Sequence, residues 1–299
     1  MDVYYHDLFT FPLPRGHRFP IQKYAMLRQR LVEEGIIRLE DLHVPAPASD
    51  DQLLLVHSQE YLHKLKNGGL TEKEIRRLGF PWSLDLVERS RRSVGSTIAA
   101  CRSALENGLA ASLAGGTHHA FPDHGQGFCV LNDVAVAVRV MQKENRAERA
   151  LIVDCDVHQG NGTAAIFEGD PRVFTFSVHG AKNFPFRKSQ SDLDIDLPDG
   201  TGDDEYLAAL EDGLEKALDE ADAEWVIYLA GADPYNGDRL GRLSLTKSGL
   251  AQRDRLVLER SRQRGLPVAV VMSGGYGEDV NDTVDIHFQT VRLAVEFSD

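Results

Sequence analysis

The stretch LIVDCDVHQGNG, residues 151–162, places three ionisable side chains directly after a short apolar run. Asp154, Asp156 and His158 follow one another at two-residue spacing, so Asp156 and His158 can point to the same side of an extended segment. Together with Asp233, which follows another apolar run, they offer two carboxylates and an imidazole. Three protein ligands leave positions open for water and substrate, as in catalytic zinc sites. The alternative is that the Asp-x-Asp-x-His string is a solvated loop.

Three further apolar runs end in residues of the same kind. The runs 109–114, 225–230 and 267–272 are followed by Gly115-Gly116-Thr117-His118-His119, Gly231-Ala232-Asp233 and Gly274-Gly275-Tyr276, respectively. In open α/β sheets, ligands bind outside the carboxyl ends of the strands, where loops bring distant residues together. We therefore expect these His, Asp and Tyr groups to converge on one site.

The adjacent histidines His118 and His119 are poorly placed to share one metal, because neighbouring side chains diverge. Imidazoles titrate near neutrality, so acid–base catalysis is the better use for them. Asp154 is a candidate to orient one ring and Asn161 the other. Tyr276 can donate its hydroxyl to a developing oxyanion, although a lone tyrosine is more often a half-buried core residue. Together these groups indicate metal-assisted hydrolysis of a carbonyl or related bond.

Continuous apolar runs that alternate with longer helical segments indicate the fold. Runs without polar alternation are typical of parallel strands covered on both faces. The expected strands are 3–5, 109–114, 150–154, 173–178, 225–230 and 267–272, and the expected helices are 21–35, 93–108, 133–145 and 203–222. This order predicts an α/β fold, with helices on both faces of a parallel β-sheet and the active site at the carboxyl ends of its strands. No linker or repeat interrupts the pattern, so we expect a single domain over residues 1–299.

The composition is that of an ordinary globular protein, with 42% hydrophobic and 26% charged residues. A formal net charge of −13 disfavours nucleic acid as a direct partner and is compatible with a cationic substrate. The three cysteines, Cys101, Cys129 and Cys155, show no Cys-x-x-Cys spacing and fit a reducing compartment. No signal peptide and no apolar run of about 20 residues is evident, so we expect a cytoplasmic protein without a membrane span.

Five stretches resemble the zinc-dependent histone deacetylase family, which shares its fold with arginases. They are PLPRGHRFPIQKY (12–24), GGTHHAFPDHGQGFCVLNDVAVA (115–137), VDCDVHQGNGT (153–163), AGADPYNGDRLGRLSLT (230–246) and SGGYGED (273–279). The similarity covers nearly the whole chain in the family's order. Where the family commonly has a His-His-Gly turn, this chain has His158-Gln159-Gly160. With GDRLGRLSL, this turn looks most like the class IV branch and its bacterial relatives.

The resemblance implies a zinc ion on Asp156, His158 and Asp233. A site with one imidazole and two carboxylates is of borderline softness, so ferrous iron is the alternative. The resemblance also implies a structural potassium or sodium ion near Asp154, Asp156, His158 and Ser177.

The resemblance assigns the catalytic roles as well. His118 would be the histidine paired with Asp154. His119 would be the general base, oriented by Asn161. Tyr276 would be the oxyanion donor.

For the substrate tunnel, the resemblance implies that Gly127 and Phe128 line the path of the acyl-lysine stem. Either Phe184 or Phe186 would be the second tunnel aromatic. Arg18 would correspond to an arginine beside an inner acetate channel.

We therefore predict a hydrolase that removes an acetyl or longer acyl group from the ε-amino group of lysine. A deacetylase of small acetylated amines such as acetylpolyamines is the alternative. A binuclear manganese ureohydrolase would need bridging carboxylates where Gly160 and Gly231 stand. A non-catalytic acyl-lysine reader would not require His118, His119 and Tyr276 together. An acylated protein or small amine is thus the expected partner, and the sequence leaves the oligomeric state open.

Overall fold

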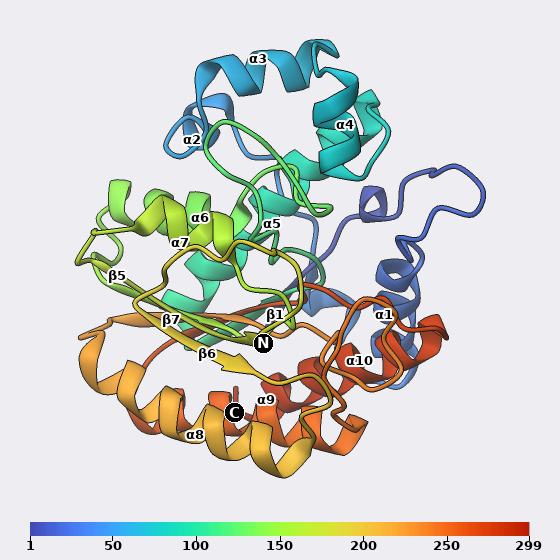
Figure 1. Cartoon of the computed structure of the whole chain (residues 1–299). Coiled ribbons are helices and arrows are strands. Elements are labelled where there is room, and N and C mark those ends of the chain that lie inside the picture. Colours follow the sequence, from blue (N-terminus) through green and yellow to red (C-terminus); the bar gives the residue numbers. More distant parts are fainter. Residues whose placement is uncertain (299) are drawn as a thin grey trace.

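A sheet of eight parallel strands runs through the middle of the molecule (Figure 1). The computed structural model describes residues 1–298. The strands lie in the order β2-β1-β3-β8-β7-β4-β5-β6. They are β1 (Asp2–Tyr4), β2 (Leu42–His43), β3 (Leu109–Ser112), β4 (Ala150–Asp154), β5 (Val173–Gly180), β6 (Leu193–Leu197), β7 (Trp225–Leu229) and β8 (Val268–Val271). The four strands that precede the chemistry-bearing residues, β3, β8, β7 and β4, are therefore adjacent at the centre.

Helices cover both faces of this sheet. The helices are α1 (Lys23–Glu33), α2 (Asp50–Leu53), α3 (Gln59–Asn67), α4 (Glu72–Leu78), α5 (Leu84–Asn107), α6 (Asp133–Lys143), α7 (Asn161–Phe167), α8 (Asp203–Glu220), α9 (Lys247–Gln263) and α10 (Val280–Glu296), with short 3₁₀ helices η1 (Asp7–Phe9) and η2 (Leu39–Asp41). Figure 1 shows α5, α6 and α7 on one face and α8, α9 and α10 on the other. Helix α1 packs against α10, and α2, α3 and α4 form an outer layer above α5.

The central strands are buried along their whole length, as their unbroken apolar runs predict. Every residue of β3, β4, β7 and β8 is buried. The predicted α/β fold, with a parallel sheet between two helical layers, is confirmed. Of the predicted single domain over residues 1–299, Asp299 lies outside the described residues. Within residues 1–298, no helix combines the length and apolarity needed to span a membrane.

Among residues 1–298, six helices and two strands were not predicted, namely α2, α3, α4, α7, α9, α10, β2 and β6. Two of the differences from the sequence prediction have an identifiable reason. The helix predicted at 93–108 is α5, which begins at Leu84, where the Ser83 hydroxyl accepts from the Leu86 amide at 3.1 Å. Its first half buries the polar residues Arg89 and Ser90, so the sequence lacks an apolar stripe there. The edge strand β6 was not predicted, because its alternating LDIDL sequence is only partly buried.

Candidate active site

Asp156, His158 and Asp233 form a buried cluster beyond the carboxyl ends of β4 and β7. Each offers one ligand atom, and these atoms all lie within 4.8 Å of one another. Nδ1 of His158 lies 3.0 Å from Oδ1 of Asp156 and 3.2 Å from Oδ2 of Asp233. The structure thus brings together the three residues predicted to bind metal around one small volume.

Backbone and hydroxyl groups fix the orientation of Asp156. Its Oδ2 accepts hydrogen bonds from the Ser273 hydroxyl and the Gly274 amide, both at 2.7 Å. Gly274 is needed at this position, because a Cβ there would lie 2.0 Å from Oδ2 of Asp233. The Gly-Gly turn after β8 therefore brings a backbone donor against the cluster.

Asp233 provides the test of whether this donor set fits a metal ion. Its Oδ1 accepts from the Val157 amide at 2.9 Å, but its buried Oδ2 has no hydrogen-bond partner among the described residues. Nδ1 of His158 lies near that oxygen without hydrogen-bonding geometry. Burial and the neighbouring Asp156 carboxylate raise the pKa of Asp233 to about 7. A cation would relieve this cost and occupy the unpaired oxygen, so the residues fit a metal.

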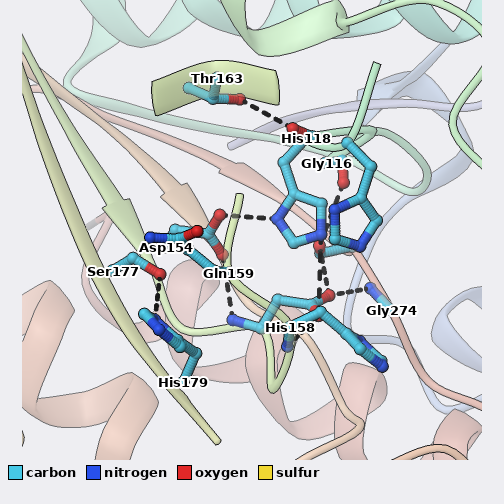
Figure 2. A network of polar contacts seen from close by, with 12 residues as sticks. Gly116, His118, Asp154, His158, Gln159, Thr163, Ser177, His179 and Gly274 are labelled. Atoms are coloured by element: carbon cyan, nitrogen blue, oxygen red, sulfur yellow. Dashed lines mark hydrogen bonds and ion pairs between the residues drawn. The ribbon is translucent and has the colours of Figure 1, made fainter. Parts of the chain in front are cut away.

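Beside this cluster lie the two adjacent histidines, each with its own partner. Nδ1 of His118 donates to Oδ2 of Asp154 at 2.6 Å, as Figure 2 shows. Nδ1 of His119 donates to Oδ1 of Asn161, the first residue of α7, at 2.8 Å. Because Nδ1 of each ring is engaged in these bonds, Nε2 is the nitrogen that can exchange a proton with a substrate or water. Both pairings agree with the roles that the family resemblance implies.

The two rings differ in charge. Burial opposes a charged His118, but the carboxylates of Asp154 and Asp156 more than offset it and raise its pKa to about 9. For His119, burial and the positive charges on His118 and His158 hold the pKa well below its usual value. His119 is therefore a neutral imidazole, able to accept a proton, beside a cationic neighbour.

Packing between α6, α7 and the loop after β3 positions this histidine pair. The His118 carbonyl accepts from the Thr163 amide in α7 at 3.0 Å. Asn132, which caps α6, donates from its side chain to the Ala120 carbonyl at 3.0 Å. The Asn132 amide in turn donates to Nε2 of the buried His57 at 3.0 Å. His57 was not predicted as a site residue, because it lies 75 positions from Asn132 in the chain.

Tyr276 approaches the cluster from the turn after β8. Its side chain is buried, and its ring centroid lies 6.4 Å from that of His158. Burial and the charges of Asp156 and Asp233 raise the pKa of Tyr276 well above its ordinary value, so the hydroxyl keeps its proton. Behind it, the buried Lys23 donates to the carbonyls of Ser273 and Gly275 at 3.3 and 3.2 Å. Lys23 thus fixes the turn that carries Tyr276, a role with no signal in the sequence.

A cavity of about 460 Å³ leads from the surface to these groups. Its floor includes His119 and Tyr276, and its walls include Gly127, Phe128 and Phe184. A Cβ on Gly127 would lie 2.8 Å from the His119 ring, so only glycine leaves room for the base. Phe128 adopts a left-handed conformation, with a φ of 66°, which is unusual for an aromatic residue. Both predicted tunnel residues therefore line this cavity.

The structure shows which of the two candidate aromatic residues packs inside the cavity. It also contradicts the predicted position of Arg18. Phe184 packs edge-on against His119, with ring centroids 4.9 Å apart, whereas Phe186 is 86% exposed at the rim. Arg18, expected beside an inner channel, is instead exposed at the mouth of the outer cavity. The arginine that lines the small inner cavity is Arg89, from α5. The prediction for Arg18 was wrong because sequence order alone does not determine where a loop residue points.

Two further residues support the site through contacts that were not predicted. Arg253 of α9 is fully buried and donates to the Cys155 and Gly231 carbonyls at 3.3 and 2.5 Å, beside both metal-site aspartates. The Gln159 side chain donates to the Ser189 carbonyl at 2.7 Å and accepts from the Ser189 amide at 2.9 Å. Gln159 is the residue that departs from the family's common turn. It ties the segment next to His158 to the loop that also carries Phe184.

The region predicted for a second cation lies between β4 and β5. Ser177 pairs with Asp154 in the ladder of these strands. Its hydroxyl is hydrogen-bonded to Nδ1 of His179 at 2.9 Å (Figure 2). Asp154 is thus bonded to the His118 ring through its side chain and lies beside Ser177 in the sheet.

Known proteins similar to this chain include histone deacetylases, in agreement with the resemblance of its motifs. The model of the histone deacetylase domain matches residues 17–291. Histone deacetylase 2 of Arabidopsis thaliana is 32% identical over 281 residues, which cover 91% of this chain and 72% of that protein. An uncharacterized protein of Picosynechococcus is 48% identical over 292 residues, covering 98% and 97% of the two chains. A histone deacetylase homologue from Aquifex aeolicus superposes with a TM-score of 0.83 at 25% identity, covering 99% of this chain and 83% of that chain.

Proposed function

Because the chain belongs to the histone deacetylase family, we propose that it removes acyl groups from the ε-amino group of lysine by zinc-dependent hydrolysis. At the coarser level, it is a hydrolase that acts on amide bonds. The observation that carries the proposal is the meeting of three features beside one cavity, which is lined by His119, His158 and Tyr276. These are the buried Asp156–His158–Asp233 cluster, the neutral His119 ring and the protonated Tyr276 hydroxyl.

Asp156, His158 and Asp233 would hold the metal, with positions left for water and the substrate carbonyl. A bound zinc ion supplies Lewis acidity, which polarises a carbonyl and lowers the pKa of water. Ferrous iron is the alternative for this donor set. A potassium or sodium ion near Asp154 and Ser177 belongs to the same proposal, supported by their pairing in adjacent strands.

His119 would take the proton from the attacking water at Nε2. It suits this role because its ring is neutral and Asn161 fixes its orientation through Nδ1. The cationic His118, paired with Asp154, would stabilise the negative charge that develops nearby.

Tyr276 would donate its hydroxyl to the oxygen of the former carbonyl as that oxygen becomes negative. The protonated state of the hydroxyl and the tie between Lys23 and its turn support this role. Phe128 and Phe184 would flank the aliphatic stem of the acyl-lysine and keep water from the reacting bond.

Two rival functions have less support. A binuclear site would need carboxylates at Gly160 and Gly231, yet a Cβ at Gly231 would already lie 2.8 Å from Cα of Asp156. A non-catalytic reader would not need a neutral base and an oxyanion donor aimed at the same floor. For the location in the cell, a cytoplasmic protein remains our proposal, and its three buried cysteines are free.

The test is a substrate panel with the purified, zinc-loaded protein. The panel contains lysine peptides with acetyl and longer acyl groups, together with acetylpolyamines, and the release of free amine is measured. We expect turnover of acyl-lysine peptides. Turnover of acetylpolyamines but of no acyl-lysine peptide would show that the protein is a deacetylase of small acetylated amines. Binding without any hydrolysis would support the reader instead.

A further inference from the structure

The mouth of the active-site cavity carries five cationic side chains and no carboxylate. The lining residues include Arg18, Arg76, Arg77, Lys182 and Arg242, with no Asp or Glu among them. All five are exposed. They come from four separate segments: the loop before α1, the last turn of α4, the loop after β5 and the loop after β7. The cluster is therefore not the solvated face of a single helix.

Most of this positive charge is unpaired within the protein. Arg76 lies 3.3 Å from Glu72, and Arg242 lies 3.2 Å from Asp199, both in exposed pairs of the kind that contribute little. Over residues 1–298, the other three cations, Arg18, Arg77 and Lys182, form no ion pair. Their charges are thus available to a molecule that approaches the cavity.

The position of these cations contrasts with the charge of the whole chain. The formal net charge is −13, so the mouth is a local positive region on an acidic protein. The guanidinium of Arg18 lies 5.6 Å from the centroid of the Phe128 ring, which places it where the tunnel wall meets solvent. The cations therefore face whatever remains outside the tunnel when an acyl-lysine stem is inside. A concave site lined by one sign of charge concentrates ligands of the opposite sign.

We propose that the preferred substrate is an acyl-lysine in an acidic polypeptide segment, with Asp or Glu flanking the modified lysine. This inference rests on the proposed deacylase function. A polyamine would bring its own positive charges to a positive mouth and be repelled. An acyl group with a terminal carboxylate would need a free cation at the floor. Of the two buried cations nearby, Lys23 is already bonded to two backbone carbonyls. Arg89, which lines the inner cavity, donates to the Tyr24 hydroxyl at 3.0 Å, and its Nε has no hydrogen-bond partner among the described residues. The succinyl-lysine comparison below therefore decides between the acyl group and the peptide flanks.

Peptides that differ only in their flanks test this proposal. One acetyl-lysine peptide has Asp and Glu flanks, a second has Ala flanks and a third has Lys flanks. We expect kcat/KM to fall in that order, with roughly tenfold or more between the extremes, mainly through KM. The spread should shrink between about 50 mM and about 500 mM salt, because salt screens exposed charges. Equal rates, or a preference for Lys flanks, would overturn the proposal.

The same preference can be tested from the side of the protein by reversing the charge of two cations at the cavity mouth. Arg77→Glu combined with Lys182→Glu should abolish or invert the preference for acidic flanks. The Arg77 contact that supports Gly127 uses only its backbone carbonyl, so this contact survives. The control is Lys143→Glu, which is also exposed in the last turn of a helix but lies near the amino end of β4, away from the site. It should leave the preference intact. A preference that survives the double reversal contradicts the proposal.

Two further measurements separate this inference from the proposed function. If no acyl-lysine peptide of any flank is hydrolysed, the proposed function fails. Fluorescence anisotropy with labelled peptides then still shows whether acidic flanks strengthen binding. A succinyl-lysine peptide with Ala flanks is compared with the acetyl-lysine peptide with acidic flanks. If the succinyl-lysine peptide has the higher kcat/KM, the cations bind the acyl group rather than the flanks, and the proposal is wrong.

Discussion

At the scale of single residues, two adjacent histidines acquire opposite properties from their surroundings. His118 faces the carboxylate of Asp154 and is cationic, whereas His119 faces the amide of Asn161 and is neutral. Divergent pKa values in neighbouring titratable groups are a mark of separate acid–base roles. The type and order of these residues are visible in the sequence. Their difference in charge depends on partners at least 36 positions away, which only the fold reveals.

The role of His119 can be separated from that of the metal ligands. His119→Ala should retain the metal and lose about 10²-fold or more in kcat, the usual contribution of a general base. Asp233→Ala is the matched comparison, and it should lose both metal and activity, because two protein ligands hold zinc poorly. Elemental analysis and kcat are measured on the same preparations. An empty site in His119→Ala would mean that ligand and base have been confused.

Tyr276→Phe tests the oxyanion donor. The substitution removes only a hydroxyl that binds the transition state better than the substrate, so kcat should fall far more than substrate affinity. The expected loss is about 10²- to 10³-fold, or about 3–4 kcal/mol, with fold and zinc content unchanged. Tyr4→Phe, on β1, is a control that removes a hydroxyl outside the site. Near-normal kcat in Tyr276→Phe would leave this tyrosine as a packing residue.

At the scale of elements, the convergence of the site follows from a general property of parallel sheets. The runs before His118, Asp156, Asp233 and Tyr276 were predicted as strands, and all become adjacent central strands. Their carboxyl ends must then meet at one edge. The supports of the site could not be predicted this way. Arg253 is a buried arginine on a helix face that also buries Asp254 and Ser261. Its contacts towards the site are to backbone carbonyls, which carry no sequence signal.

His57 links the outer helices to the catalytic loop and should make stability depend on pH. It is buried, donates through Nδ1 to the Phe121 carbonyl and accepts from the Asn132 amide. Burial lowers the pKa of His57 to about 4. The unfolded chain takes up a proton below about pH 6.5, while the folded protein resists it down to pH 4. The stability from this group is thus complete above pH 6.5 and is lost towards pH 4, by about 3 kcal/mol at most.

The comparison of wild type with His57→Gln isolates this effect. Glutamine can donate and accept at the same position but does not titrate. The unfolding free energy of each protein is measured in urea at about pH 7.5 and about pH 5. We expect the advantage of the wild type to shrink by about 2 kcal/mol at the lower pH. An advantage of the same size at both values would show that His57 does not carry this dependence.

At the scale of the whole molecule, the distribution of charge matters more than its sum. The net charge of −13 is compatible with a cationic substrate, but the active-site mouth is lined by cations. The sequence could not show this, because the five side chains lie on four segments that only the fold brings together. The family was recognisable from its motifs, since these lie at the strand exits where the chemistry constrains residue type.

Titration of zinc into the metal-free protein tests whether Asp156, His158 and Asp233 form a catalytic site for a single metal ion. Zinc is added in steps, and both bound metal and acyl-lysine hydrolysis are measured in each sample, with Asp233→Ala treated in parallel. The site at Asp156, His158 and Asp233 predicts that turnover rises in proportion to bound zinc and saturates at one ion per chain. Asp233→Ala should show neither binding nor turnover. Full hydrolysis by the metal-free protein, or turnover that requires two ions per chain, would rule out a mononuclear zinc site at these residues.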